Sequence, residues 1–194
     1  MRFAALYCLL PTAYLLLPTP YCFFRRRVLS VIKIGMGYDV HQLIRGRKLV
    51  LGGVRVLYEK GLLGHSDADV LVHAVIDALL GAAHLGDIGR LYPDSDPQYK
   101  DVSSLRLLEK TGRLVEKNGY SLMNADAVII AESPRLAPYL DRMQSNMAHA
   151  LQVPATCMHV KATTHEGIGC FGKGEGIGAM CVALLNQGLE GKDE

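Results

Sequence analysis

The run from Ser66 to Leu80 (SDADVLVHAVIDALL) constrains the fold of this chain more than any other segment. Its apolar residues recur at helical spacing, and Asp69, His73 and Asp77 are four positions apart, so they share one face of a helix. Ser66 with Asp69 resembles a capping box at its start, and Gly81 follows as a stop signal. The pattern predicts a helix with one polar stripe among Val, Leu and Ala.

Strand and helix patterns alternate along the rest of the chain. The segment 33–42 (KIGMGYDVHQ) alternates apolar and polar residues, and 49–56 has the Gly-Gly turn of a hairpin. Helices are expected at 103–117 and 136–151, strands at 125–131, 158–163 and 177–185, and a loop at 91–98. This order predicts an α/β (α+β) fold, a single domain in which helices cover one face of a mixed four-stranded sheet.

Length and charge narrow the class of protein. The chain has 194 residues, 49% of them apolar, which fits one packed domain. Four arginines and no acid precede residue 32, so the formal charge of +2 becomes −2 for residues 32–194. A slightly acidic body gives no reason to expect nucleic acid as a partner, because that binding depends on Lys and Arg neutralising phosphates.

Residues 1–31 form a hydrophobic and basic extension, set apart from a domain expected at 32–190. One interpretation is a targeting leader; the other is an over-extended start with no role in the fold. A stable membrane span is not expected, because Pro11, Pro18 and Pro20 would each remove a helix hydrogen bond. The five cysteines include no C-x-x-C pair, which favours a reducing compartment. We expect a cytoplasmic protein of bacterial type, or a plastid or apicoplast protein if the extension is a leader.

A metal site is predicted from three side chains. Asp39 and His41 are two apart on a predicted strand and so leave the same face, although two surface residues would show the same spacing. His73 lies mid-helix between Asp69 and Asp77, and an acid beside the second ring nitrogen is what a ligating histidine needs. A single core histidine is the alternative. Two histidines, one carboxylate and an open fourth position form a catalytic zinc pattern.

Two further segments are candidates for phosphate and sugar contacts. His65 and Ser66 precede the capped helix, where free backbone N–H groups favour a phosphate; a plain N-cap serine is the alternative. The segment 86–89 (GDIG) and Asp94 can bind sugar hydroxyls, or can be solvated acidic loops.

A second cation is predicted late in the chain. Thr163 and Thr164 end a strand, and Glu166 opens a glycine-rich stretch. Hydroxyls, backbone amides and one carboxylate suit magnesium or manganese bound jointly with substrate phosphates. Tight turns in a hairpin would equally explain the glycines.

Together these segments resemble the 2-C-methyl-D-erythritol 2,4-cyclodiphosphate synthase family of non-mevalonate isoprenoid biosynthesis. The resemblance covers residues 32–190, and its motifs are GYDVHQL at 37–43, EKGLLGHSDADVLVH at 59–73, DALLGAAHLGDIG at 77–89, YPDSDP at 92–97, and VKATTHEGIG with GKGEGIG within 160–178. It implies a homotrimer with active sites between subunits. The implied reaction converts 4-diphosphocytidyl-2-C-methyl-D-erythritol 2-phosphate to the cyclic diphosphate and CMP.

The resemblance also implies residue roles, position by position. Zinc would be held by Asp39, His41 and His73, and a second Mg or Mn by Glu166 with substrate phosphates. His65 and Thr164 resemble the pair that supports the transition state. Substrate contacts are implied for Ser66, Asp87, Ile88, Gly89 and Asp94, and a cytidine pocket for Ala131, Pro134, Ala137 and Thr163.

The chain departs from the family pattern at Cys170, usually Phe, and Lys173, usually Arg. Both resemble residues around a central cavity of the trimer, where an anion or isoprenoid diphosphate binds. A lysine supplies charge there but not the planar, bidentate hydrogen-bonding geometry of arginine.

Two alternative functions remain at this point: a zinc-dependent phosphodiesterase that admits water, and a non-catalytic trimer that binds isoprenoid diphosphates.

Overall fold

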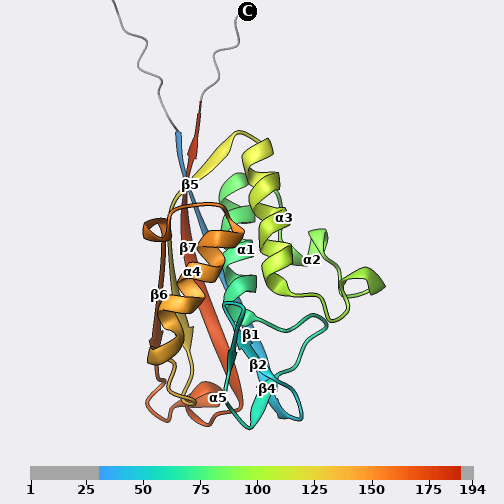
Figure 1. Cartoon of the computed structure of the whole chain (residues 1–194), viewed down its shortest axis with the longest axis vertical. Coiled ribbons are helices and arrows are strands. Elements are labelled where there is room, and N and C mark those ends of the chain that lie inside the picture. Colours follow the sequence, from blue (N-terminus) through green and yellow to red (C-terminus); the bar gives the residue numbers. More distant parts are fainter. Residues whose placement is uncertain (1–30, 189–194) are drawn as a thin grey trace, which may run out of the picture.

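The computed structural model describes residues 31–188, so the extension predicted at 1–31 lies, apart from Val31, outside the described residues. A mixed sheet forms the centre of the fold, in the order β4-β1-β7-β5-β6 (Figure 1). Its strands are β1 (Val31–Arg45), β4 (Lys60–Leu62), β5 (Tyr120–Ile130), β6 (Met158–Thr163) and β7 (Gly176–Gln187). Only β5 and β6 are parallel. The predicted mixed sheet is confirmed, with the short β4 added at its edge.

Three long helices cover one face of this sheet, as predicted (Figure 1). They are α1 (Val70–Ala83), α3 (Ser104–Lys117) and α4 (Leu140–Ala150). The last begins four residues later than expected, because a 3₁₀ turn at Ala137–Tyr139, with Pro138 inside it, occupies the predicted first turn. Two four-residue helices, α2 (Ile88–Leu91) and α5 (Gly169–Gly172), lie in segments expected to be loops.

Both predicted ends of α1 were wrong. Its N-cap is Asp69 rather than Ser66, and the Asp69 side chain accepts a hydrogen bond from the N–H of Val72 at 3.2 Å. The helix continues through Gly81 and ends at Ala83, and its C-cap His84 has a left-handed backbone. Gly81 is therefore an exposed helical residue and not a stop.

Asp69 also ties the hairpin of β2 (Leu49–Leu51) and β3 (Val54–Val56) to α1. Its carboxylate accepts hydrogen bonds from the N–H groups of Gly52 at 2.9 Å and Gly53 at 2.7 Å, in the predicted Gly-Gly turn. Complete burial, with the nearby charge of Asp67, raises the pKa of Asp69 to about 6 despite these donors. Asp69, one acid of the predicted polar stripe, therefore has a structural role: it joins the hairpin to α1.

Helix α1 lies directly on β1 because glycines leave no side chain between them. A Cβ atom at Gly37 would overlap the carbonyl oxygen of Ala74 and lie 2.7 Å from the nitrogen of Ala78. At Gly35 it would lie 2.9 Å from the Cβ of Ala82. This close approach carries His73 toward the strand that holds Asp39 and His41.

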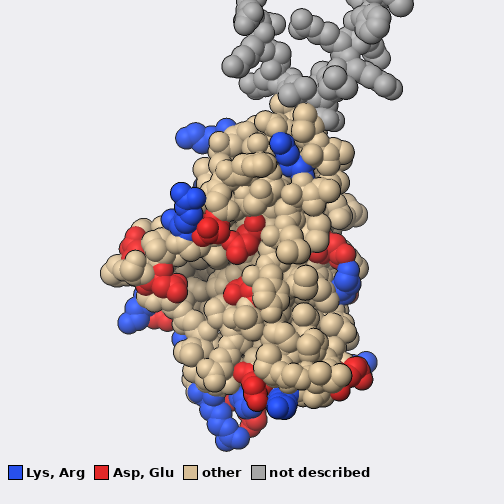
Figure 2. All heavy atoms as spheres, turned by 180° about the vertical axis from the view of Figure 1, so that it is seen from behind, with Lys and Arg blue, Asp and Glu red and all other residues tan. Residues whose placement is uncertain are grey.

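The opposite face of the sheet is apolar, and no other segment between residues 31 and 188 covers it. Alternate residues of β1 point to it: Ile32, Ile34, Met36, Tyr38 and Val40 are 45–69% exposed, and Met180 and Val182 of β7 are 37% and 47% exposed. Viewed from behind, the molecule has a broad area without charged residues (Figure 2). Among the described residues, no helix combines the length and apolarity needed to cross a bilayer.

Candidate metal centre

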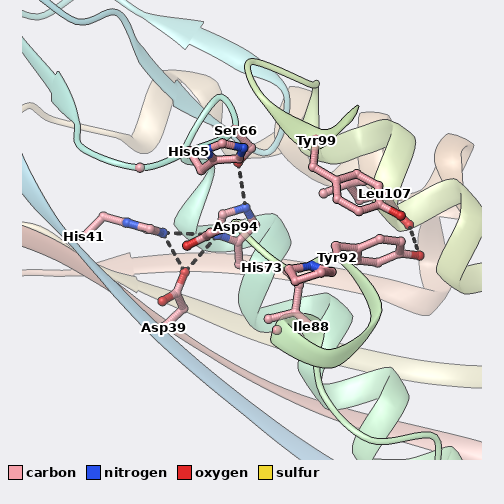
Figure 3. Close-up of a pocket in the computed structure, with 13 residues that line it drawn as sticks. Asp39, His41, His65, Ser66, His73, Ile88, Tyr92, Asp94, Tyr99 and Leu107 are labelled. Atoms are coloured by element: carbon pink, nitrogen blue, oxygen red, sulfur yellow. Dashed lines mark hydrogen bonds and ion pairs between the residues drawn. The ribbon is translucent and has the colours of Figure 1, made fainter. Parts of the chain in front are cut away.

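Asp39, His41 and His73 converge at one end of α1, as the sequence predicted (Figure 3). Asp39 Oδ2 lies 2.9 Å from His41 Nε2 and 3.0 Å from His73 Nδ1. The two ring nitrogens are 3.1 Å apart. Three ligand atoms this close can share one ion at the usual bond lengths of about 2.0–2.2 Å, so the group fits a divalent metal.

The second nitrogen of each ring has its own partner. His41 Nδ1 donates to the carbonyl oxygen of Leu63 at 2.7 Å, which leaves Nε2 free to bind an ion. His73 Nε2 lies 2.9 Å from Ser104 Oγ. The expectation that Asp69 or Asp77 would fill this role was wrong, because both carboxylates accept backbone N–H groups instead.

Asp77 accepts from the N–H of Ile88 at 2.7 Å, so it holds the start of α2 rather than His73. On a helix, residues four apart share a face, but each side chain forms hydrogen bonds with the donors that lie nearest to it. Here the donors opposite the acids are backbone N–H groups of neighbouring segments.

The pKa of Asp39 is lowered at this centre, and the pKa of His41 is raised. Burial alone would raise the pKa of Asp39, but hydrogen bonds and charge from His41 and His73 outweigh it and hold that pKa well below its usual range. For His41, burial lowers the pKa, yet the hydrogen bond and charge of Asp39 leave it raised. An ionised carboxylate between two imidazoles is a suitable donor set for a divalent cation.

The three side chains border a cavity of about 290 Å³. His65, Ser66, Ile88, Gly89 and Asp94 also line it, so five of the predicted contact residues surround the metal centre. Asp87 does not line this cavity; it is exposed and caps α2 by accepting from the N–H of Arg90 at 2.9 Å. His65 Nε2 is buried without a partner in the described structure.

Part of the cavity wall was missed in the sequence. Tyr92 and Tyr99 pack edge to face with ring centroids 5.4 Å apart, and Tyr92 contacts Thr111 Oγ1 at 3.0 Å. Leu107 of α3 completes this side (Figure 3). Tyr92 lies in the segment 91–98 that was predicted to be a loop, and Tyr99 follows that segment, so nothing in their spacing marked them as wall residues.

A second cavity, of about 430 Å³, lies where β5 and β6 end. It is lined by the residues of the predicted cytidine pocket, Ala131, Pro134, Ala137 and Thr163, and by Thr164. Glu166 follows, and its carboxylate accepts a hydrogen bond from Thr164 Oγ1. The two cavities share no lining residue, so His65 and Thr164 border different cavities of one chain. Cys170 is exposed on α5, and Lys173 is exposed at its C-cap.

Comparison with known proteins decides the family. The model of the YgbB family matches residues 32–186. The chain belongs to the YgbB family. Curated members include 2-C-methyl-D-erythritol 2,4-cyclodiphosphate synthase of Desulforamulus reducens, 57% identical over 81% of this chain and 100% of the relative. The Clostridium perfringens synthase is 56% identical over 79% of this chain and 99% of the relative. The resemblance inferred from the motifs is confirmed.

Solved YgbB-family structures share the fold. IspF of Plasmodium falciparum, solved as a CDP complex, has a TM-score of 0.71 and 31% identity, over 81% of this chain and 97% of that one. The bifunctional IspDF of Campylobacter jejuni has a TM-score of 0.79 and 42% identity over 81% of this chain, which spans 43% of that larger protein.

Proposed function

We propose that this chain is a 2-C-methyl-D-erythritol 2,4-cyclodiphosphate synthase, which converts 4-diphosphocytidyl-2-C-methyl-D-erythritol 2-phosphate to the cyclic diphosphate and releases CMP. The observation that carries the proposal is the Asp39, His41 and His73 group at the wall of a cavity of about 290 Å³. Membership of the YgbB family and the names of its members at 51–57% identity support the same reaction.

Zinc is the ion that this donor set favours, since two imidazoles and one carboxylate leave a fourth position open. When bound there, it supplies Lewis acidity toward a phosphate oxygen. The residues of the chain orient the substrate around that point. His65, whose Nε2 is without a partner, is placed to donate to a phosphate oxygen, and Asp94 is exposed at the cavity rim to accept from sugar hydroxyls.

Holding the 2-phosphate beside the β-phosphorus is the main contribution of the protein to the rate. The nucleophile and its target belong to one molecule, so fixing their orientation replaces a bimolecular encounter. The new P–O bond forms as the bond to CMP breaks, and the negative charge that develops requires donors and cations rather than a general base. Glu166, with the substrate phosphates, is proposed to hold a second ion, Mg or Mn.

The cytidine end of the substrate is proposed to occupy the cavity at Ala131, Pro134, Ala137 and Thr163 of a neighbouring subunit. The CDP complex of the Plasmodium falciparum relative supports a cytidine nucleotide as ligand. A site completed by a neighbour fits a chain in which His65 and Thr164 border separate cavities.

The uncovered apolar sheet face is proposed to form the centre of a homotrimer. Ile34 is 69% exposed there, and such a continuous apolar area is characteristic of an interface.

Ile34→Glu is expected to convert the trimer to monomer in sedimentation equilibrium and to abolish turnover, because a buried unpaired charge at an interface is strongly unfavourable. Leu57→Glu, at a 78% exposed position outside that face, is the control. An Ile34→Glu protein of wild-type mass would rule out this face.

The reaction is tested by incubating the full chain with the cytidyl substrate, zinc and magnesium, and following products by phosphorus NMR. A cyclic diphosphate with CMP is the expected outcome. A linear monophosphate with CMP would instead identify a phosphodiesterase that admits water. Tight binding of isoprenoid diphosphates without any turnover would identify a non-catalytic binding protein. The cytoplasm, or an organelle if residues 1–31 are a leader, is the proposed location.

A further inference from the structure

We infer that Ser104 and Asp67 are positioning residues that select the ring tautomer of His73 and so prepare it to bind a metal through Nδ1. The inference deepens the metal centre of the proposed function and rests on it. Its basis is a chain of hydrogen bonds that leads from His73, away from the cavity, into the protein. Ser104 is the first residue of α3 and is fully buried.

The direction of each hydrogen bond in this chain follows from counting protons. Ser104 Oγ has a single hydrogen, and it donates this to the carboxylate Oδ1 of Asp67. Toward His73 Nε2, at 2.9 Å, Ser104 can therefore only accept. The Nε2 atom must carry the ring proton, which leaves the lone pair on Nδ1, the nitrogen that faces Asp39 at 3.0 Å.

Asp67 is itself held so that its oxygens stay acceptors. Oδ2 accepts from the backbone N–H of Ser104 at 3.0 Å, and Oδ1 accepts from the N–H of Asp69 at 3.3 Å. Ser103, the N-cap of α3, makes no side-chain capping bond, so Asp67 takes over that role from a preceding loop. The Asp67 carboxylate thus joins its loop to α3. Through Ser104 it also determines which ring nitrogen of His73, on α1, carries the proton.

Ser66 is the only other side chain among the described contacts of His73 Nε2, at 3.3 Å from its Oγ. That hydroxyl already accepts from the N–H of Ala68 at 3.1 Å. The hydrogen of the Ser66 hydroxyl can be donated to Ser104 Oγ, 3.4 Å away, and a contact of 3.3 Å constrains the ring less than Ser104 at 2.9 Å. His41 differs, because its second nitrogen donates to a backbone carbonyl that no substitution removes.

The test compares Ser104→Ala with Ser103→Ala, the same substitution one residue earlier, where the side chain makes no capping bond. Zinc affinity of the full chain is measured by competition with a chromophoric chelator. We expect Ser104→Ala to bind zinc about 10–100-fold more weakly, the usual loss when a partner behind a ligand is removed, and Ser103→Ala to match wild type. Thermal melting of both variants checks that they fold.

A second readout reports the tautomer itself. In zinc-loaded, nitrogen-15-labelled wild type, the Nε2–H of His73 should appear as a slowly exchanging ring proton, and Ser104→Ala should lose that protection. Asp67→Asn should also weaken zinc binding by tenfold or more, because its amide can donate to Ser104 Oγ and free the hydroxyl to donate to His73. That reversal favours the Nδ1–H tautomer, which cannot bind the ion.

The outcomes separate this inference from the proposed reaction. Wild-type zinc affinity and an unchanged Nε2–H signal in Ser104→Ala would overturn the inference. A wild-type chain that binds no zinc would overturn it together with the proposed metal centre. If wild type binds zinc, Ser104→Ala binds it more weakly, and no cyclic diphosphate forms, then the inference holds and the proposed reaction is wrong.

Discussion

Replacing His73 by alanine is expected to lower turnover by roughly 10³-fold or more and to remove tightly bound zinc. Lewis-acid stabilisation of developing charge contributes several kcal/mol, and each ~1.4 kcal/mol is a factor of ten in rate. His73 supplies one of only three ligand atoms in the group, all within 4.8 Å of one another. Asp39 and His41, both on β1, are too few to hold the ion without the ligand from α1.

The measurement pairs zinc content after dialysis with formation of cyclic diphosphate by phosphorus NMR. His149→Ala is the matched control, since His149 is also helical but exposed on α4, away from the metal centre. The His73 side chain is only 12% exposed and contacts Asp39 and Ser104, so its removal should also lower the melting temperature; melting curves therefore confirm that the variant is folded at the assay temperature. Wild-type zinc content and turnover in His73→Ala would disprove the metal centre.

The ligands of this centre were predictable because each lies in a regular element with a clear period. Asp39 and His41 are two apart on a strand, and that spacing alone places both on one face, which in the structure is the face toward α1. Pairing of β1 with β7, from opposite ends of the chain, could not be read from the sequence, since local patterns do not specify which strands become neighbours.

The partner of His73 was not predictable for a related reason. Acids four residues away on the same helix looked like its partners, but Ser104 lies 31 residues later and reaches the ring only because α3 packs beside α1. Asp69 and Asp77 meet backbone N–H groups that the fold brings to them. Helical periodicity places side chains on a face, whereas tertiary packing decides which donors stand opposite.

The division of the site between two cavities was implied by the family resemblance, but no local sequence pattern indicates it. Thr163 and Thr164 were correctly placed at the end of a strand, yet that strand, β6, is at the far edge of the sheet from the short β4. His65 precedes α1 near β1, on the other side. In the proposed trimer, a neighbouring copy brings the second half of the site to the first.

The close packing of α1 on β1 leads to the other large effect. Gly37→Ala is expected to destabilise the fold by about 3 kcal/mol or more, because the new Cβ would overlap backbone atoms of Ala74 and Ala78, which have no rotamer to change. For a chain of this size that corresponds to a fall in melting temperature of roughly 6–12 °C. Any folded fraction should also bind zinc poorly, since α1 must move away from Asp39 and His41.

The matched control for Gly37→Ala is Gly81→Ala, the same substitution on the exposed side of α1, where a Cβ would meet nothing within 4 Å. There alanine should stabilise the protein by roughly 0.5–1 kcal/mol, because glycine loses more backbone entropy in a helix. Melting curves are compared at one protein concentration, since association of subunits contributes to stability. If Gly37→Ala melted at the wild-type temperature, α1 could not lie against β1 as closely as the structure has it. In that case the metal centre, whose third ligand reaches the strand only through this contact, would lack its structural basis.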